Sequence, residues 1–245
     1  TSFNKSVLPA WFGDDRVLIL SRTATSNPDA RQRWRAASAD DWRRYDAAAG
    51  HDFVGIGENS GRKLIRFAFF RDPINRAVSK WYHHLNKDEP SEAMKRLLDH
   101  HNGNVVSYLA ETDLAFDYLR AFLPLELHLA YQSAIQRSDG SADFITRYPE
   151  LWRAMLDKAV TNMASLDYML LTERFTDSLK LLGTRIGKPV PQIERHRVGS
   201  IPDSVRANIE RLRPELEAAQ SNAYALMQVV RAKFERQMEG LRVAA

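Results

Sequence analysis

The chain contains 245 residues, and its 35 Lys and Arg against 31 Asp and Glu give a formal net charge of +4. Hydrophobic residues make up 44% and charged residues 27%, which is typical of a globular protein and excludes a disordered or fibrous chain. The sequence has no run of about 18 apolar residues, so it contains no transmembrane helix.

Cysteine is absent, which excludes disulfides, thiolate catalysis and cysteine-ligated metal ions. Its absence also favours a reducing compartment, so we expect a cytoplasmic protein of bacterial type. The isoelectric point near 9.3 suggests an anionic partner. A net charge of +4 is modest for a nucleic-acid binder, which concentrates positive charge on one face. We therefore expect a small polyanionic ligand and no nucleic acid.

The first quarter of the chain predicts short elements. An apolar stripe of Phe3, Val7, Leu8 and Trp11 indicates a helix over residues 1–12. We then expect a strand at Val17–Leu20, one or two surface helices over 22–49 capped by Gly50, a strand at His51–Ile56 and a loop at 57–63. Asp14-Asp15 and Asp40-Asp41 are expected to cap helices rather than to bind an ion.

Leu64–Phe70 is the strongest strand signal, because it is almost entirely apolar, as a central parallel strand covered on both faces would be. The strand is followed by Asp72, which can cap a helix, and by Pro73, which is favoured at the first helical position. We expect that helix to run to about Leu85.

The remaining elements alternate in the same way. Helices are expected at 91–101, 104–121, 148–164 and 175–186, a second buried strand at Tyr168–Thr172, and a loop at 189–203. Strands that alternate with helices predict an α/β fold with a parallel sheet flanked by helices.

Near the C-terminus, apolar residues recur at alternating spacings of four and three from Val205 to Val230. This heptad pattern fits a coiled coil that would make the protein an oligomer. The pattern also fits two helices that pack on their own domain. These helices would be separated at Pro214, because proline in a helix interior costs about 3 kcal/mol. We favour the second interpretation.

The corner after the Leu64–Phe70 strand is the best candidate site. In an open α/β sheet, ligands bind beyond the carboxyl ends of the strands, and Arg71 stands there beside a helix N-terminus. A guanidinium in that position can bind an anion, and Ser79 could add a hydroxyl donor. The alternative is an ordinary strand-to-helix turn with Arg71 in a surface salt bridge.

The segment Arg71-Asp-Pro, followed by Arg76 and then Ser79, resembles the 3′-phosphate-binding segment of sulfotransferases that use PAPS (3′-phosphoadenosine 5′-phosphosulfate). In particular it resembles the heparan sulfate 2-O- and galactose 3-O-sulfotransferases and related bacterial enzymes. This resemblance implies a sulfotransferase fold like that of P-loop nucleotide kinases, as one domain over residues 1–245. It implies that Arg71 and Ser79 bind the 3′-phosphate of PAPS.

The resemblance also implies a role for His51, which lies about 20 residues before Arg71. At this point the family places a histidine that acts as the catalytic base. Imidazole, with a pKa of about 6.5, can accept a hydroxyl proton near neutral pH. Without the resemblance, His51 would be interpreted as a structural histidine that begins a strand.

Two other segments resemble parts of the nucleotide site. Thr1 and Ser2 match the last residues of the family's 5′-phosphosulfate loop, so they are expected to contact that group; the lysine of that loop is not in this sequence. Arg195 and Arg197 fall where the family closes a loop over the nucleotide, and a solvated charged turn is the alternative there. The segment Asp167–Leu179 resembles a scaffold strand and helix of the family, and its Glu173 and Arg174 are expected either to face the site or to form a buried structural ion pair.

The histidine pairs His83-His84 and His100-His101 are expected to be surface residues, with contact between the acceptor and His83 or His84 as the alternative. Adjacent histidines on a helix point about 100° apart and do not readily chelate one ion, so we expect no metal. By resemblance, the expected function is transfer of the sulfuryl group from PAPS to a carbohydrate hydroxyl. A non-catalytic anion- or glycan-binding α/β module is the alternative, and a Golgi-lumenal location would apply to a eukaryotic relative. A sugar or nucleotide kinase is disfavoured, because no acidic metal ligands accompany a phosphate loop.

Overall fold

The structure is a computed structural model, and it describes residues 3–20, 36–50, 57–86, 95, 98–135, 137–138, 141–192 and 201–243. It is mostly helical (70%) with small parallel sheets, which agrees with the predicted α/β class. Among the described residues, no helix is both long enough and apolar enough to cross a membrane.

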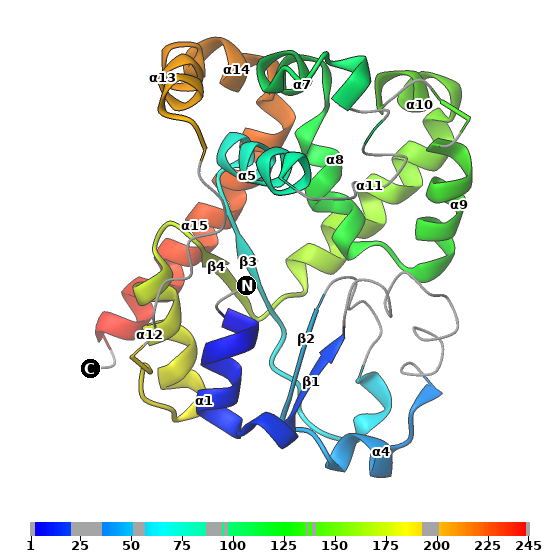
Figure 1. Cartoon of the computed structure of the whole chain (residues 1–245). Coiled ribbons are helices and arrows are strands. Elements are labelled where there is room, and N and C mark those ends of the chain that lie inside the picture. The colour runs from blue at the N-terminus through cyan, green and yellow to red at the C-terminus, as the bar shows by residue number, and fades with distance from the viewer. Residues whose placement is uncertain are drawn as a thin grey trace.

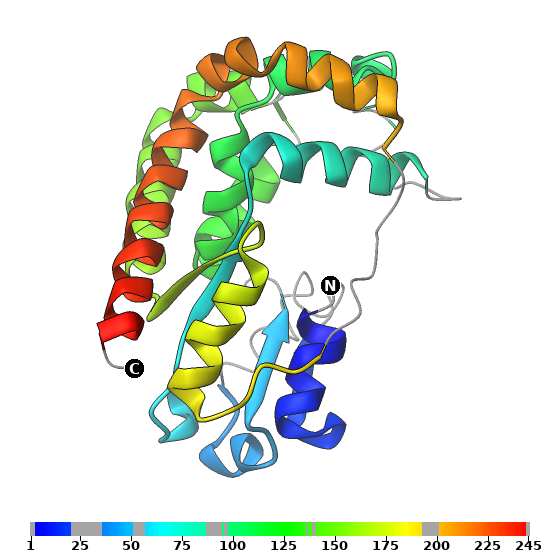
Figure 2. The same cartoon turned by 90° about the vertical axis from the view of Figure 1, so that its left-hand side faces the viewer.

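The strands form two parallel pairs. They are β1 (Val17–Leu20) beside β2 (Ala47–Gly50), and β3 (Phe67–Phe70) beside β4 (Tyr168–Leu171). Parallel pairing was the expectation for β1, β3 and β4, although β3 and β4 are shorter than predicted. In Figure 2, β2 and β3 both run toward the end of the molecule where α5 lies.

The strand β2 corrects the prediction that residues 22–49 are helical up to a cap at Gly50. The helix there, α4 (Ala39–Arg43), begins in a capping box between Ser38 and Asp41 and ends after one turn. Beyond it, Asp46 is fixed by Arg16 at 2.9 Å and by Arg62 at 3.1 Å. Ala47 then pairs with Val17 of β1, and this pairing overrides the helix preference of the alanine run.

The helices fall close to the predicted ranges in most of the chain. They are α1 (Leu8–Phe12), α5 (Pro73–Leu85), α7 (Val105–Glu111), α8 (Leu114–Leu119), α9 (Leu125–Ile135), α10 (Ser141–Arg147), α11 (Pro149–Ala164), α12 (Phe175–Ile186), α13 (Asp203–Arg211), α14 (Arg213–Ala219) and α15 (Ser221–Val243). Short π and 3₁₀ turns lie at Phe3–Val7 (η1), Asp14–Arg16 (η2), Glu58–Ser60 (η3) and Arg120–Phe122 (η4). The sequence did not predict α9 and α10.

The β3–β4 pair lies in the main hydrophobic core. Leu170 of β4 is fully buried, with Leu182 of α12 and Phe234 of α15 in the same cluster. Phe3 and Trp11, from the predicted apolar stripe, pack into this core as well, and Trp11 donates to the Pro189 carbonyl at 2.7 Å. In Figure 1, α1 and α12 lie on one side of these strands and α15 runs behind them.

The helices α5, α7–α11, α13 and α14 form the upper part of the molecule in Figure 1, around two further cores. One core joins α5, α7, α13 and α14 around Trp81, and the other joins α8, α9, α10 and α11 around Phe144. The predicted helix over 104–121 is interrupted where Asp113 caps α8. The buried side chain of Gln220 fills this break, because it accepts from the Leu114 amide at 2.9 Å and donates to the carbonyls of Leu109 and Thr112.

The C-terminal apolar seam packs on its own chain. Ile209, Leu216, Ala223 and Val230 are buried in the cores described above. The helix is broken next to Pro214, as the favoured interpretation predicted, and again at Gln220. These breaks let α13 and α14 cross over α5 while α15 descends along β4 (Figure 2).

Candidate functional site

The β3–α5 corner places Arg71 at the carboxyl end of a buried parallel strand. Phe70, the last residue of β3, is 3% exposed, and Asp72, which follows Arg71, is 6% exposed. Asp72 accepts from the Asn75 amide at 3.0 Å, so the predicted cap is confirmed. Arg71 itself is half-buried, and its guanidinium forms no ion pair with the residues that the structure describes.

Two of the amide groups at the start of α5 are already hydrogen-bonded. Glu173, which follows β4, accepts from the Asp72 amide at 2.7 Å, and the Asn75 amide is bound to Asp72. Pro73 has no amide hydrogen. The sequence predicts one anion site made of Arg71 and this helix N-terminus, and these two amides are not available to such a site.

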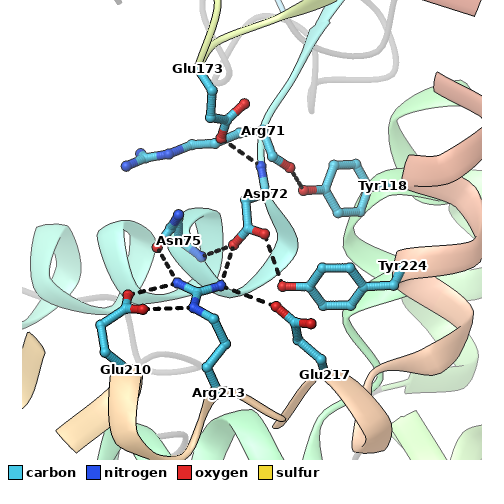
Figure 3. Close-up of polar contacts among 9 residues, drawn as sticks. All are labelled: Arg71, Asp72, Asn75, Tyr118, Glu173, Glu210, Arg213, Glu217 and Tyr224. Carbon is cyan, nitrogen blue, oxygen red and sulfur yellow. Dashed lines mark hydrogen bonds and ion pairs between the residues drawn. The ribbon is translucent and has the colours of Figure 1, made fainter. Parts of the chain in front are cut away.

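Asp72 is the centre of a polar cluster that ties α5 to the C-terminal helices (Figure 3). Its Oδ2 accepts from the Tyr224 hydroxyl at 2.9 Å, and its Oδ1 lies 3.5 Å from Nη1 of Arg213. Arg213 also contacts Glu210 at 2.8 Å and Glu217 at 3.4 Å. We call these residues, with Asn75, the Asp72–Arg213 cluster. Figure 3 shows the Arg71 side chain extending away from it.

The pKa values of three members of the cluster are shifted away from neutral pH. The hydrogen bond from Arg213 to Glu210 raises the pKa of the guanidinium and lowers that of the carboxyl group. Burial, followed by the hydrogen bond to Asp72, raises the pKa of Tyr224. The cluster is therefore a structural network of paired charges and is not a proton-transfer site near neutral pH.

Tyr118 of α8 supports the corner from the other side. Its hydroxyl donates to the Arg71 carbonyl, and the guanidinium of Arg76 lies 4.4 Å from the centre of its ring. Burial raises the pKa of Tyr118, so the hydroxyl remains protonated and available as a donor. The backbone at Arg71 is thus held by α8, while its side chain has no such anchor.

Of the residues that the resemblance assigned to the site, two are described. Arg71 lies at the corner, and Ser79 is half-buried in the second turn of α5. Ser79 is about 9 Å further along the helix than Pro73, at 1.5 Å per residue.

The other assigned residues, Thr1, Ser2, His51, Arg195 and Arg197, lie outside the described residues. Gly50, the neighbour of His51, ends β2, so His51 follows the carboxyl end of a parallel strand.

Two interpretations of charged residues need correction. Glu173 and Arg174 do not form the ion pair considered from the sequence; Arg174 instead contacts Asp177 at 2.9 Å and Glu235 at 2.5 Å. His101 is not a surface residue, because it is only 4% exposed. The sequence also missed Tyr118, Arg213 and Tyr224, which reach the corner from distant parts of the chain.

A hollow of about 440 Å³ lies at the opposite end of the β3–β4 pair, near Ile65, Tyr168 and Gln237. It lies beside the beginnings of β3 and β4, whereas the Arg71 corner lies at their carboxyl ends. Ligands of α/β sheets bind beyond the carboxyl ends of the strands. For this reason we place the candidate site at Arg71.

Comparison with known proteins identifies no relative: no family model, curated protein or solved structure matches the chain. The fold and the site therefore define only a class. The protein is a mostly helical α/β protein in which Arg71, at the carboxyl end of a parallel strand, forms no ion pair with the described residues.

Proposed function

We propose that the protein is a PAPS-dependent sulfotransferase that acts on a carbohydrate hydroxyl. The observation that carries the proposal is the half-buried guanidinium of Arg71, which is unpaired among the described residues, at the carboxyl end of β3. It is supported by the spacing of Arg71, just before α5, and Ser79, within α5, which resembles the 3′-phosphate-binding segment of the carbohydrate sulfotransferases. We also propose that the chain has the fold of these sulfotransferases.

The Arg71 corner suits a phosphate group on physical grounds. A guanidinium can donate two parallel hydrogen bonds to a phosphate, and such charge-assisted bonds are about twice as strong as neutral ones. Partial burial strengthens the attraction, because the surroundings screen the charge less than bulk water does. The carboxylate of Glu173 is held by the Asp72 amide and forms no ion pair with Arg71.

In this proposal, each remaining residue has one task. Thr1 and Ser2 contact the 5′-phosphosulfate, while Arg195 and Arg197 cover the nucleotide. The acceptor oxygen forms a bond to sulfur as the bond from sulfur to the 5′-phosphate oxygen breaks. His51 takes the acceptor proton, and PAP (3′-phosphoadenosine 5′-phosphate) leaves. General-base catalysis of this kind contributes about 10²–10⁴ in rate.

The direct test is transfer of labelled sulfate from PAPS to a panel of oligo- and polysaccharides by the natural full-length protein. We expect transfer that is lost in His51→Ala and kept in Arg153→Ala, a substitution on the exposed face of α11. PAP binding without transfer to any acceptor would favour a non-catalytic anion- or glycan-binding module. If the protein neither binds PAP nor transfers sulfate to any acceptor, the proposed function is refuted.

A further inference from the structure

Three side chains outside the Arg71 corner converge on one point of the surface near α7. They are His100, His101 and Glu111, and their nearest nitrogen and oxygen atoms all lie within 4.8 Å of one another. In the part of the chain that the structure describes, no other group of three such residues could hold a metal ion.

The backbone explains why two adjacent histidines can converge. The helical segment ends at His100, and His101 begins a turn. Asn102 and Gly103 then adopt left-handed conformations, with φ of 48° and 68°. The separation of about 100° expected for neighbours on a helix therefore does not apply, and the centres of the two imidazole rings lie 4.7 Å apart.

The distances between the donor atoms fit a small tetrahedral ion. Oε2 of Glu111 lies 3.5 Å from Nε2 of His100 and 3.7 Å from Nδ1 of His101. With metal–ligand bonds of 2.0–2.1 Å, the edge of a coordination tetrahedron is about 3.3–3.4 Å. Closing two of the edges around an ion thus requires shifts of only a few tenths of an ångström.

The inner side of the cluster is already rigid. His101 is buried, with its ring in contact with the rings of Trp81 and Tyr108 at centre distances of 6.2 and 5.6 Å. Ser107 of α7 donates to Oε1 of Glu111 at 2.8 Å and lies 3.1 Å from Nδ1 of His101. The hydrogen bond from Ser107 orients the Glu111 carboxylate, as supporting hydrogen bonds of metal ligands do, whereas a metal ion on Nδ1 of His101 would replace the contact of that nitrogen with Ser107. Coordination through Nδ1 uses the histidine tautomer that carries its proton on Nε2.

We propose that His100, His101 and Glu111 form a binding site for a divalent transition metal ion of the zinc type. Two imidazoles and one carboxylate are a donor set that zinc accepts, and magnesium or calcium would require more oxygen ligands. Three protein ligands leave a fourth position for water or another ligand. That position faces solvent, because the His100 and Glu111 side chains are 66% and 56% exposed. The site is independent of the proposed sulfotransferase function, which needs no metal.

The test is titration of the metal-stripped full-length chain with Zn²⁺ in competition with a chromophoric chelator. We expect saturation at one equivalent. Because ligand and supporting residues each contribute about 10–100-fold to metal affinity, His100→Ala and Glu111→Gln are expected to weaken binding by at least about tenfold. Both positions are exposed, so these variants retain the fold, which circular dichroism would verify. His101 is left unchanged, because replacing a buried ring risks unfolding.

Matched controls are His83→Ala and Glu150→Gln, which change an exposed histidine on α5 and an exposed glutamate on α11. Both are expected to bind Zn²⁺ as the parent chain does. Titration with Co²⁺ adds a spectroscopic readout, since a tetrahedral site gives intense visible absorption that Glu111→Gln should abolish. Absence of saturable binding, or binding that neither His100→Ala nor Glu111→Gln weakens, would overturn the proposal.

Discussion

Two arginines flank Asp72, and the fold uses them in opposite ways. Arg213 reaches Asp72 from α14 and is also bound to Glu210 and Glu217. Arg71 precedes Asp72 in the chain, and its guanidinium has no ion-pair partner among the residues that the structure describes (Figure 3). The first arginine joins two parts of the fold, and the second carries a positive charge that no described residue neutralises.

The difference matters because a partly buried charge without a partner carries a desolvation cost. In the Asp72–Arg213 cluster, paired carboxylates and a hydroxyl group offset that cost. At Arg71 nothing described offsets it, so an anionic ligand would bring the missing interaction. Charged side chains that the fold does not pair with an opposite charge are expected at functional sites. The comparison therefore predicts that the two arginines respond differently to substitution.

The largest effect is expected at the centre of the cluster. Asp72→Ala removes the cap of α5 and leaves both Arg213 and the Tyr224 hydroxyl without their buried acceptor. Removing one partner of a buried charged pair costs about 3–5 kcal/mol. Urea unfolding followed by circular dichroism should show a loss in that range. A loss below about 1 kcal/mol, the size of an ordinary cap, would contradict a structural role for the cluster.

Arg213→Ala should have the next largest effect. The substitution leaves three carboxylates, those of Asp72, Glu210 and Glu217, without the cation that they share. Because Arg213 retains some exposure, we expect a loss of about 2 kcal/mol, less than for a fully buried charge. The same unfolding experiment measures it. The PAP affinity of the folded variant should stay within about threefold of the parent value. If Arg213→Ala loses as much PAP affinity as Arg71→Ala does, the two arginines do not have different roles.

Tyr224→Phe tests the cluster through pH. The hydrogen bond to the Asp72 carboxylate is expected to contribute about 1.5 kcal/mol at neutral pH. The pKa of Tyr224 is raised in the folded chain, so above about pH 10 the unfolded chain releases this proton first and stability falls as the pH rises. Unfolding measured across this range should show a smaller alkaline loss in Tyr224→Phe. A full alkaline loss in the variant would assign it to other tyrosines, such as Tyr118.

The smallest effect on stability is expected for Arg71→Ala. Its guanidinium forms no described ion pair, so the free energy of unfolding should change by no more than about 0.5 kcal/mol. Unfolding in urea, beside Arg153→Ala as a surface control, measures the change. A loss comparable to that of Arg213→Ala would show that Arg71 is also a structural residue, and the distinction between the two arginines would fail.

Local sequence signals predicted the part of the fold that positions the site. The apolar run before Arg71 and the Asp72-Pro73 pair predicted β3, its turn and the start of α5. The end of α12 was likewise predicted, because Gly187 adopts the left-handed conformation that caps a helix, with φ of 69°. Each of these features depends on residues that are adjacent in the chain.

The secondary-structure predictions were wrong where the conformation of a segment depends on residues far away in the sequence. Residues 47–50 form a strand because β1 pairs with them, although alanine favours helices. The helix α9 had a usable signal, since Leu127, Tyr131 and Ala134 recur at spacings of four and three on one face. The sequence interpretation left that stretch unassigned.

The same reasoning applies to the two sites. Arg71 could be found from its place after a strand, but the partners of Asp72 could not, because Tyr224 lies 152 residues further along the chain. The convergence of His100 and His101 with Glu111 depends on the turn at Asn102 and Gly103, which ends the helix early. The His100-His101 pair was assumed to lie within a helix, and that assumption produced the wrong expectation for His101.

The most direct test of the central claim is calorimetric titration of the natural full-length protein with PAP and, separately, with adenosine 5′-phosphate, which lacks the 3′-phosphate. If Arg71 binds that phosphate, PAP should bind about 10- to 100-fold more tightly than adenosine 5′-phosphate, and Arg71→Ala should remove most of this preference while Arg153→Ala keeps it. Equal affinity for the two nucleotides, or a preference for PAP that survives in Arg71→Ala, would contradict the account.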